Sequence, residues 1–444
     1  MHYWFARTGF AFAGILTFTF SATAQTETEL IEGNEVVAKQ VLVKFRNATK
    51  DAVAEVIRGN NVDSFESLTE SVTLIRSRDA SVVTLMQNLA KRDDVEYVEP
   101  NYLLYSTAVP DDPLFGHQYA LQNTGQDILG TLGVPGADIG AVQAWDITTG
   151  SQANVVAVVD TGLDYTHPDL VDNVWSAPED FTVHIGDVDI TCPAGSHGFN
   201  AITNVCDPLD DNGHGTHCSG VIGAVGNNGI GVSGINWTAS IMGAKFLGAS
   251  GTGSTSDAVK AIQFTIQAKQ IFANTGGANV RVLSNSWGGG PSQTLADAIA
   301  LAQNNDILFV VAAGNGHRDI DVSPLYPASY GIPNEIVVAG TDNQDGRYVN
   351  TNYGINSVHL GAPGVRVDST YRGGYAYLTG TSMATPQVSG AAILILSACD
   401  LDTPTLKQVI LDNVDPIDSM SGITATGGRL NVYSALSACT SGAQ

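Results

Sequence analysis

Three segments of the chain carry side chains that together could supply a nucleophile, a base and an orienting acid. In the first, the apolar run Val155 to Val159 ends in Asp160-Thr161-Gly162, so a carboxylate stands at the carboxyl end of a predicted buried strand. An aspartate that only caps the following turn would give the same pattern. The role of Asp160 can therefore be inferred only together with the other two segments.

The second segment, Asp211 to Cys218, places two histidines at the start of a predicted helix. His214 is expected near the same sheet edge as Asp160, with flanking glycines that leave room for a substrate. His214 and His217 could instead bind zinc from one helix face, but the sequence shows no third ligand in a matching motif. The sequence favours a base at His214 over a metal ligand.

The third segment, Gly380 to Pro386, places Ser382 between a glycine-bearing turn and a helix. Free N–H groups and the positive end of the helix dipole could stabilise a developing anion there. The alternative is a serine that caps the helix, which is worth about 1 kcal/mol. A further buried run, Leu308 to Ala313, leads to Asn315, whose amide could cap a turn or donate a hydrogen bond to an oxyanion.

Each segment is ambiguous alone, but four of them at strand ends or helix starts are a combination that chance seldom produces. The order Asp160, His214, Ser382 is that of the subtilisin triad. The chain resembles the subtilisin-like serine peptidases, which carry the matching Asp-Thr-Gly, His-Gly-Thr-His and Gly-Thr-Ser-Met-Ala-Thr-Pro motifs. The resemblance extends from about Asp111 to Ala438.

The resemblance implies a serine endopeptidase that cleaves proteins and peptides through an acyl-enzyme on Ser382. His214 would act as general base and acid, Asp160 would orient it, and Asn315 with the Ser382 backbone N–H would bind the oxyanion. An inactive relative that only binds peptides would have no need to retain all four residues. A zinc hydrolase using His214 and His217 is the other alternative.

The resemblance also implies where a substrate would lie, extended as an added strand. One edge would be Ser286-Trp287-Gly288 and the other Leu247, Gly248, Ser250 and Gly251. Trp287 could equally be a core aromatic. The walls of the primary specificity pocket would be Ser286 to Gly288 with Ala312, Ala313 and Gly314, and Leu325 at its base would make it apolar and shallow.

A structural calcium ion is a further implication of the resemblance, because hard oxygen ligands from several loops suit this ion. The expected ligands are the side chains of Asp112, Asp169 and Asn228 and the carbonyls of Ile230 and Val232. The alternative is that these are ordinary turn residues. A second site near Asp207 and Asp210 is a weaker expectation.

Five cysteines leave at least one thiol unpaired. We predict the disulfides Cys192–Cys206 and Cys399–Cys439, although sequence does not give the geometry of either. Cys218 is predicted to be a free, largely buried thiol one helical turn after His214. It is not expected to be the nucleophile, because it lies inside a helix without donors for an oxyanion.

The elements that must position these residues follow from the hydrophobic pattern. After residue 111, apolar β-rich runs alternate with helical patterns, which predicts an α/β fold with a largely parallel central sheet and helices on both faces. This catalytic domain is expected to span 111–438. In such sheets ligands bind beyond the carboxyl ends of the strands.

The N-terminal part predicts a secreted precursor. Arg7, the apolar run Phe10 to Phe20 and the small residues Ser21 to Ala24 are typical of a signal peptide over 1–24. That run is shorter than the roughly 20 residues of a membrane span, so no stable membrane anchor is expected. Secretion to the extracellular space or the periplasm follows.

A small α+β domain is predicted over 36–105, followed by an exposed processing linker at 106–110. The domain resembles the family's propeptide, which is an intramolecular chaperone and inhibitor, and we expect cleavage between Tyr105 and Pro110. The net charge of -24 argues against nucleic acid as a partner. We expect a monomer.

Overall fold

The structure is a computed structural model that describes residues 27–31, 34–46, 62–103 and 108–441. The chain divides into two compact units, Met1–Ser106 and Thr107–Gln444. The predicted signal peptide and residues 104–107, which hold part of the predicted cleavage region, lie outside the described residues. The two units are described separately.

The first unit is a small antiparallel sheet with one described helix. Its strand order is β1-β2-β4-β3, with β5 paired to β2. Helix α2 (Val82–Leu89) buries Val82, Leu85 and Leu89, which recur on one helix face and contact the buried side of β2. The predicted α+β character is confirmed. The strands are β1 (Thr28–Ile31), β2 (Asn34–Phe45), β3 (Val62–Ser67), β4 (Val72–Ser77) and β5 (Val95–Tyr102).

The second unit is built on a nine-stranded sheet whose order is β11-β12-β8-β13-β14-β15-β16-β20-β19. Each neighbouring pair is parallel except β20 with β19. The predicted, largely parallel sheet is confirmed. The strands are β8 (Gly150–Asp160), β11 (Gly198–Asn200), β12 (Thr238–Lys245), β13 (Val280–Asn285), β14 (Leu308–Ala312), β15 (Glu335–Thr341), β16 (Leu360–Pro363), β19 (Asp415–Pro416) and β20 (Gly428–Arg429).

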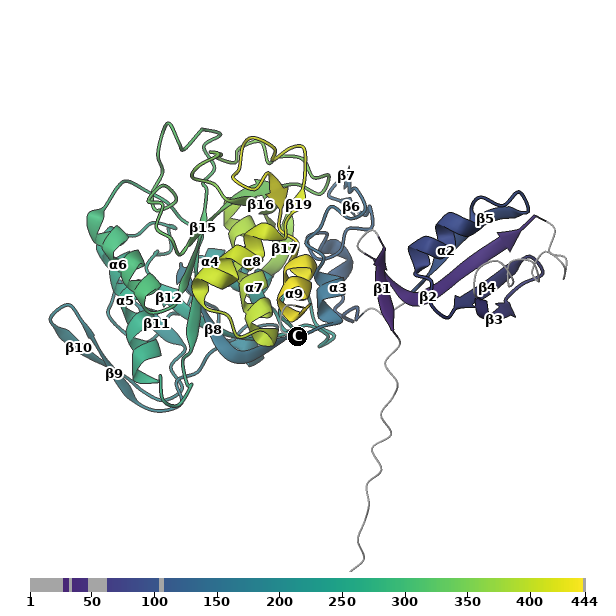
Figure 1. Ribbon diagram of the computed structural model, residues 1–444. Coiled ribbons are helices and arrows are strands. Elements are labelled where there is room, and N and C mark those ends of the chain that lie inside the picture. The colour runs from purple at the N-terminus through teal and green to yellow at the C-terminus, as the bar shows by residue number, and fades with distance from the viewer. Residues whose placement is uncertain (1–26, 32–33, 47–61, 104–107, 442–444) are drawn as a thin grey trace, which may run out of the picture. The chain divides into compact units, whose positions relative to one another are not determined.

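Helices cover both faces of this sheet, as predicted (Figure 1). Alternate residues of β8 enter different cores: Val156 and Val158 pack with one set of helices, whereas Val155, Ala157 and Val159 pack with the other. This is why the run has no polar residue. The first set is α3 (Ala141–Trp145), α4 (His214–Gly223), α7 (Thr381–Ala398), α8 (Thr403–Asp412) and α9 (Val432–Ser441), and the second is α5 (Thr255–Ile271) and α6 (Gln293–Asn304).

Short elements complete the second unit. Hairpin β9–β10 (Phe181–Ile185 and Val188–Cys192) contacts α5, and hairpin β17–β18 (Val367–Tyr371 and Gly374–Leu378) contacts α4. The others are η1 (Phe115–His117), η2 (Val171–Asn173), β6 (Asp127–Ile128) and β7 (Thr131–Leu132). Of the helices in the described ranges, none is by itself long and apolar enough to cross a bilayer; α7 and α8 pass that test only as a pair bent by 114°.

Both predicted disulfides are present. Cys192–Cys206 closes the long loop before α4, and its Cα atoms are 5.4 Å apart. Cys399–Cys439 joins the end of α7 to α9 across a Cα distance of 6.3 Å. Cys218 is free and buried.

The carboxyl edge of the sheet gathers the predicted functional residues. Strand β8 ends at Asp160, and β13 and β14 end shortly before Ser286 and Asn315. Helices α4 and α7 begin at His214 and Thr381, beside these strand ends. The fold therefore brings together side chains that lie more than 200 residues apart in the sequence.

Candidate active site

Asp160 and His214 form the centre of the site. The Nδ1 of His214 donates a hydrogen bond of 2.8 Å to Oδ1 of Asp160, whose side chain is fully buried. The backbone N–H of Thr161 donates to the same oxygen at 2.7 Å. The imidazole is thereby fixed in the tautomer that leaves Nε2 free to accept a proton.

The pKa of His214 reflects this pairing. Burial alone would lower it, but the charge of Asp160 and the hydrogen bond to it outweigh burial, so the pKa lies above the ordinary histidine value. Asp160 therefore favours the protonated imidazolium. A base with that property can take a proton from a nucleophile and hold it during the reaction.

The loop before α4 fixes the position of His214. Gly213 cannot cap the helix with a side chain, and Asp210 replaces that cap by accepting hydrogen bonds from the N–H groups of Gly213 and Thr216. A Cβ on Gly215 would come within 2.2 Å of the carbonyl oxygen of Gly162. Glycine thus allows the first turn of α4 to approach the end of β8.

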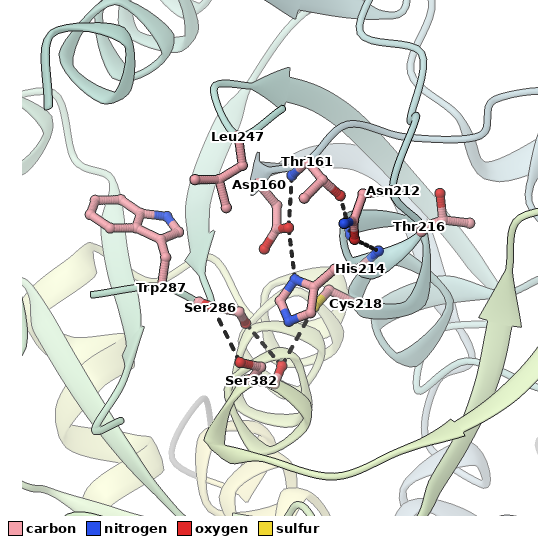
Figure 2. Close-up of polar contacts among 12 residues, drawn as sticks. Asp160, Thr161, Asn212, His214, Thr216, Cys218, Leu247, Ser286, Trp287 and Ser382 are labelled. Atoms are coloured by element: carbon pink, nitrogen blue, oxygen red, sulfur yellow. Dashed lines mark hydrogen bonds and ion pairs between the residues drawn. The ribbon is translucent and has the colours of Figure 1, made fainter. Parts of the chain in front are cut away.

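Ser382 lies in the first turn of α7, next to His214 (Figure 2). Pro386 has no N–H, so it cannot make the helical hydrogen bond to the carbonyl of Ser382. That carbonyl instead accepts from Ser286 Oγ at 2.9 Å and from Cys218 Sγ at 3.5 Å. A proline one turn later therefore lets two side chains hold the backbone of Ser382.

The hydroxyl of Ser382 donates to the carbonyl of Ser286 at 3.2 Å and not to His214. Figure 2 shows the imidazole between Asp160 and Ser382, with a hydrogen bond drawn only to Asp160. A rotation about the Cα–Cβ bond of Ser382 can redirect the hydroxyl toward Nε2. Hydrogen bonds of this kind often tighten only when substrate is bound.

Asn315 directs its amide nitrogen toward the start of α7. Its Oδ1 accepts from the N–H of Thr381 at 2.9 Å, which fixes the orientation of the amide. Its Nδ2 makes no hydrogen bond to another described residue, and it lies 3.4 Å from a Cβ built on Gly380. A free donor next to Ser382 is suited to bind an oxygen that acquires negative charge.

A hollow of about 420 Å³ opens beside His214, and we call it the active-site cleft. Of the predicted substrate residues, its wall contains Leu247, Gly251, Ser286, Trp287 and Gly288. The indole of Trp287 packs edge-on against Phe246 and donates to the carbonyl of Val159 at 2.8 Å. Trp287 is therefore both a core aromatic and part of the cleft wall, the two roles that the sequence left open.

The remaining predicted substrate residues lie outside the wall of this hollow: Gly248, Ser250, Ala312, Ala313, Gly314 and Leu325. A Cβ on Gly314 would lie 2.4 Å from Leu325 Cδ2, and one on Gly288 would lie 3.1 Å from the same atom. Leu325 thus packs between the two predicted pocket walls. Leu325 therefore narrows the space between these two walls.

Lys245 was not anticipated from the sequence. It pairs in register with Asp160 at the end of β12, and its side chain is 4% exposed. Its ammonium group donates to the carbonyl of Thr161 (2.5 Å), to Asp211 Oδ1 (2.7 Å) and to the carbonyl of Leu247 (2.9 Å). One buried cation therefore joins the strand end after Asp160, the loop before His214 and the edge of the cleft.

Cys218 lies beside Asp160, His214 and Ser382, as predicted for a residue one turn after His214. Burial, assisted by the charge of Asp160, raises the pKa of its thiol well above the usual value, so the sulfur stays protonated. In the described ranges, Asp160, His214 and Cys218 are the one group of three or more possible metal-ligating side chains whose ligand atoms lie within 4.8 Å of one another. His214 and Asp160 are hydrogen-bonded to each other, and the sulfur of Cys218 donates to the carbonyl of Ser382.

His217 does not share a ligand site with His214. Its Nε2 lies 2.9 Å from the carbonyl of Ala376 and 3.1 Å from that of Val367, so this nitrogen carries the proton and joins α4 to hairpin β17–β18. The zinc alternative required both histidines to face one ion. The geometry gives them separate partners.

The buried imidazole of His217 predicts a loss of stability in acid. Burial lowers its pKa from 6.5 to about 4, so below pH 6.5 the unfolded chain binds a proton that the folded protein does not. The free energy of unfolding should fall by about 3 kcal/mol between pH 6.5 and pH 4. Urea unfolding of His217→Gln, which keeps a donor but does not titrate, should show a shallower pH dependence than the parent. Equal slopes would contradict this assignment.

The predicted calcium ligands lie in one cluster. Asp112 accepts from the N–H groups of Asn227 and Asn228, and Asp169 accepts from Asn228 Nδ2 at 2.9 Å and from the N–H of Val232 at 3.0 Å. Ile230 donates its N–H to Asn228 Oδ1. The N–H groups of Ile230 and Val232 are thus engaged within the cluster, and the part of their carbonyls stays a prediction.

Comparison with known proteins agrees with this geometry. Residues 151–431 match the sequence profile of the subtilase family, and residues 22–101 match that of the fervidolysin N-terminal prodomain. The chain is 35% identical over 358 residues to a thermophilic serine proteinase of Bacillus sp. (strain AK1), covering 80% of this chain and 76% of the relative. It is 31% identical to an extracellular protease of Xanthomonas campestris, covering 97% and 76%.

A solved structure and a further relative give the same result. Proteases from Pseudoalteromonas arctica superpose with a TM-score of 0.57 at 26% identity, over 75% of this chain and all of that chain. Thermitase of Thermoactinomyces vulgaris is 35% identical over 74% of this chain and 99% of its own length. The chain belongs to the subtilase family, and it is a subtilisin-like serine protease that carries an N-terminal prodomain.

Proposed function

We propose that the protein cleaves proteins and peptides through an acyl-enzyme on Ser382, with His214 as general base and acid. The observation that carries this proposal is the placement of the His214 imidazole between Asp160 and Ser382, with its Nδ1 bonded to the buried carboxylate at 2.8 Å. Nε2 takes the proton of the Ser382 hydroxyl as Oγ attacks the substrate carbonyl. The imidazolium then gives this proton to the leaving amine.

The second half of the reaction reverses these roles. Water attacks the acyl group while His214 accepts its proton, and Ser382 leaves with a proton from the imidazolium. Asn315 Nδ2 and the Ser382 N–H at the start of α7 bind the oxyanion in both steps. Asp160 holds the tautomer and stabilises the imidazolium without taking the proton.

The substrate lies extended in the active-site cleft. Its part before the cleaved bond pairs with the edges Ser286 to Gly288 and Leu247 to Gly251. Of these two edges, Ser286, Trp287, Gly288, Leu247 and Gly251 line the hollow beside His214. Leu325, between Gly288 and Gly314, restricts the primary pocket to modest apolar side chains. The enzyme acts as a monomer.

The protein is made as a secreted zymogen. The prodomain match at 22–101 and the apolar segment before it support a precursor whose first unit inhibits the second until the linker near 106–110 is cut. Two disulfides and a relative named as an extracellular protease support export. We infer that the catalytic unit of the precursor cuts this linker itself.

Substitution of Ser382 by alanine tests this function. The secreted Ser382→Ala protein should keep its prodomain, because the attacking hydroxyl is missing, and mass spectrometry should find no N-terminus between residues 105 and 110. Ser421→Ala removes an exposed hydroxyl and should mature like the parent. If Ser382→Ala shows the parent's mature N-terminus when produced alone, another protease performs the cut.

We also propose that the cluster around Asp112 and Asp169 binds calcium. Burial raises the pKa of both carboxyls, the charge of Asp112 adds to the effect at Asp169, and neither has an ion pair with Lys or Arg in the described part of the chain. Two buried carboxylates and the Asn228 amide form an oxygen-rich donor set that suits this ion. Asp210 is engaged as the cap of α4, so a second site there stays a prediction.

Calcium should stabilise the protein through this cluster. At about 100 times its dissociation constant, a ligand adds about 2.7 kcal/mol, which should raise the unfolding temperature of the Ser382→Ala protein by roughly 5 °C. Asp169→Asn should lose most of this rise, whereas Asp187→Asn, at an exposed hairpin tip, should keep it. A full rise in Asp169→Asn would contradict the site.

A further inference from the structure

A second hollow adjoins the active-site cleft, and we propose that it binds an apolar side chain of the substrate, about five or six residues before the cleaved bond. The inference rests on the proposed function and extends it to a remote specificity site. The hollow has a volume of about 350 Å³ and lies between hairpin β9–β10, α5 and the start of α6. We call it the α5 groove, and its wall includes Ile185, Gly186, Thr255, Val259, Gln263 and Thr294.

Helix α5 forms a wall of both hollows. Thr255 lines each of them, Ala258 faces the cleft, and Val259 and Gln263 face the groove. At about 100° per residue, positions 255, 259 and 263 form one stripe, and position 258 lies beside it. The two hollows therefore occupy neighbouring faces of the same helix, with Thr255 on the boundary.

The segment before α6 is the second shared wall. Gly290 lines the cleft, and Ser292 and Thr294 line the groove. Ser286, at the other end of this edge, is hydrogen-bonded to Ser382. An extended strand that pairs with Ser286 to Gly290 covers roughly 13 Å from the nucleophile, at about 3.3 Å per residue. Its next residue or two would reach the groove.

The tip of hairpin β9–β10 closes the groove on the third side. The hairpin is held against α5 by Gln267, which accepts from the N–H of His184 at 2.7 Å and donates to its carbonyl at 2.6 Å. Ile185, the next residue, lines the groove. The position of this wall is therefore set by side-chain hydrogen bonds to the helix that also borders the cleft.

The chemistry of the wall favours an apolar occupant. Ile185 and Val259 are aliphatic, and the threonines add methyl groups. The charge of Lys260 is engaged, because its Nζ lies 3.0 Å from Asp257 Oδ1 and 3.3 Å from the carbonyl of Ala201. Its methylene stem is what remains to line the groove. A leucine or phenylalanine fits this surface better than an acidic residue does.

Peptide substrates of different length test the inference. A parent peptide with four residues before the cleaved bond is compared with peptides extended at the N-terminus by two residues, of which the outer is either leucine or aspartate. The leucine peptide should have a kcat/KM about tenfold above that of the aspartate peptide, because an apolar side chain is removed from water. The ratio within each variant is the readout, so a general change in activity cancels.

Two variants should remove this preference. Val259→Asp places a charge in the groove, and Thr294→Phe fills it from an exposed position on the opposite wall. Both should bring the ratio close to one. Ile271→Asp is the matched control, since Ile271 is an exposed aliphatic residue of α5 outside the groove, and it should keep the parent's ratio.

Several results would overturn the inference. The parent enzyme could show no preference between the two extended peptides, or Val259→Asp and Thr294→Phe could keep the ratio that Ile271→Asp keeps. A preference confined to residues after the cleaved bond would also overturn it. If the parent enzyme fails to hydrolyse even the unextended peptide, the proposed function itself is wrong and this inference falls with it.

Discussion

Replacing His214 with alanine is expected to lower kcat about 10⁶-fold, the loss measured when the corresponding base is removed from subtilisin. The imidazole is hydrogen-bonded to the buried Asp160 carboxylate and lies next to Ser382, so it is the base placed to take the proton of that hydroxyl. KM should change little, because the base contributes to the chemical step and not to substrate binding. His184→Ala, which removes an exposed imidazole on a hairpin, is the control.

The measurement must allow for maturation, since His214→Ala should not release itself. The precursor is therefore cut in the segment after the prodomain by a second protease, which is then inactivated with its own specific inhibitor. Peptide hydrolysis is followed with His214→Ala, His184→Ala and the parent enzyme treated alike. A loss of less than about 100-fold would be too small for a general base and would point to another catalytic group.

Replacing Asn315 with alanine should lower kcat by about 10²–10³, the cost of removing one donor from an oxyanion site. The Oδ1 of Asn315 is engaged by Thr381, so its free Nδ2 is the group that would bind the oxyanion. Because this donor acts mainly when the oxygen acquires charge, KM should stay near the parent value.

Two further variants separate this effect from damage to the start of α7. Asn315→Asp keeps the oxygen that accepts from Thr381 but has no N–H donor, and it should be at least as impaired as Asn315→Ala. Asn350→Ala removes an exposed amide elsewhere and should be fully active. A rise in KM with unchanged kcat would assign Asn315 to substrate binding instead.

The positions of the proposed catalytic residues could be predicted because each stands where a hydrophobic pattern stops. Asp160 ends an apolar run that supplies both cores, and Ser382 opens a helix that is buried along most of its length. Such boundaries can be read from the amino-acid sequence alone. Because parallel strands end at the same edge of a sheet, the residues at these boundaries are then expected to lie close together.

Lys245 shows what a sequence pattern does not reveal. A lysine at the end of an apolar run is usually exposed to solvent, yet here its acceptors are Thr161, Asp211 and Leu247, from three separate segments. That these three acceptors lie around one ammonium group depends on the tertiary fold. The spacing between Ser382 and Pro386, in contrast, does carry a signal, because a proline four residues later always frees a helical carbonyl.

The binding surfaces were predicted less completely than the catalytic residues. Asn212, Thr255 and Leu295 line the cleft although nothing in their local sequence marks them. Leu325 was placed near the pocket, but that it packs against Gly314 depends on how a long loop folds back. At the calcium cluster the predicted residues lie close together, whereas the directions of the Ile230 and Val232 carbonyls depend on backbone dihedral angles that a sequence pattern does not give.

Labelling of the mature enzyme with a fluorophosphonate, followed by peptide mapping, tests the central claim most directly. The reagent should form a single adduct on Ser382, rapidly in the parent and in Cys218→Ala, and at a negligible rate in His214→Ala and Ser382→Ala. The difference among these variants would show that the reactive group is a serine activated by His214. An adduct on Cys218, or labelling of Ser382→Ala at the parent rate, would contradict the account.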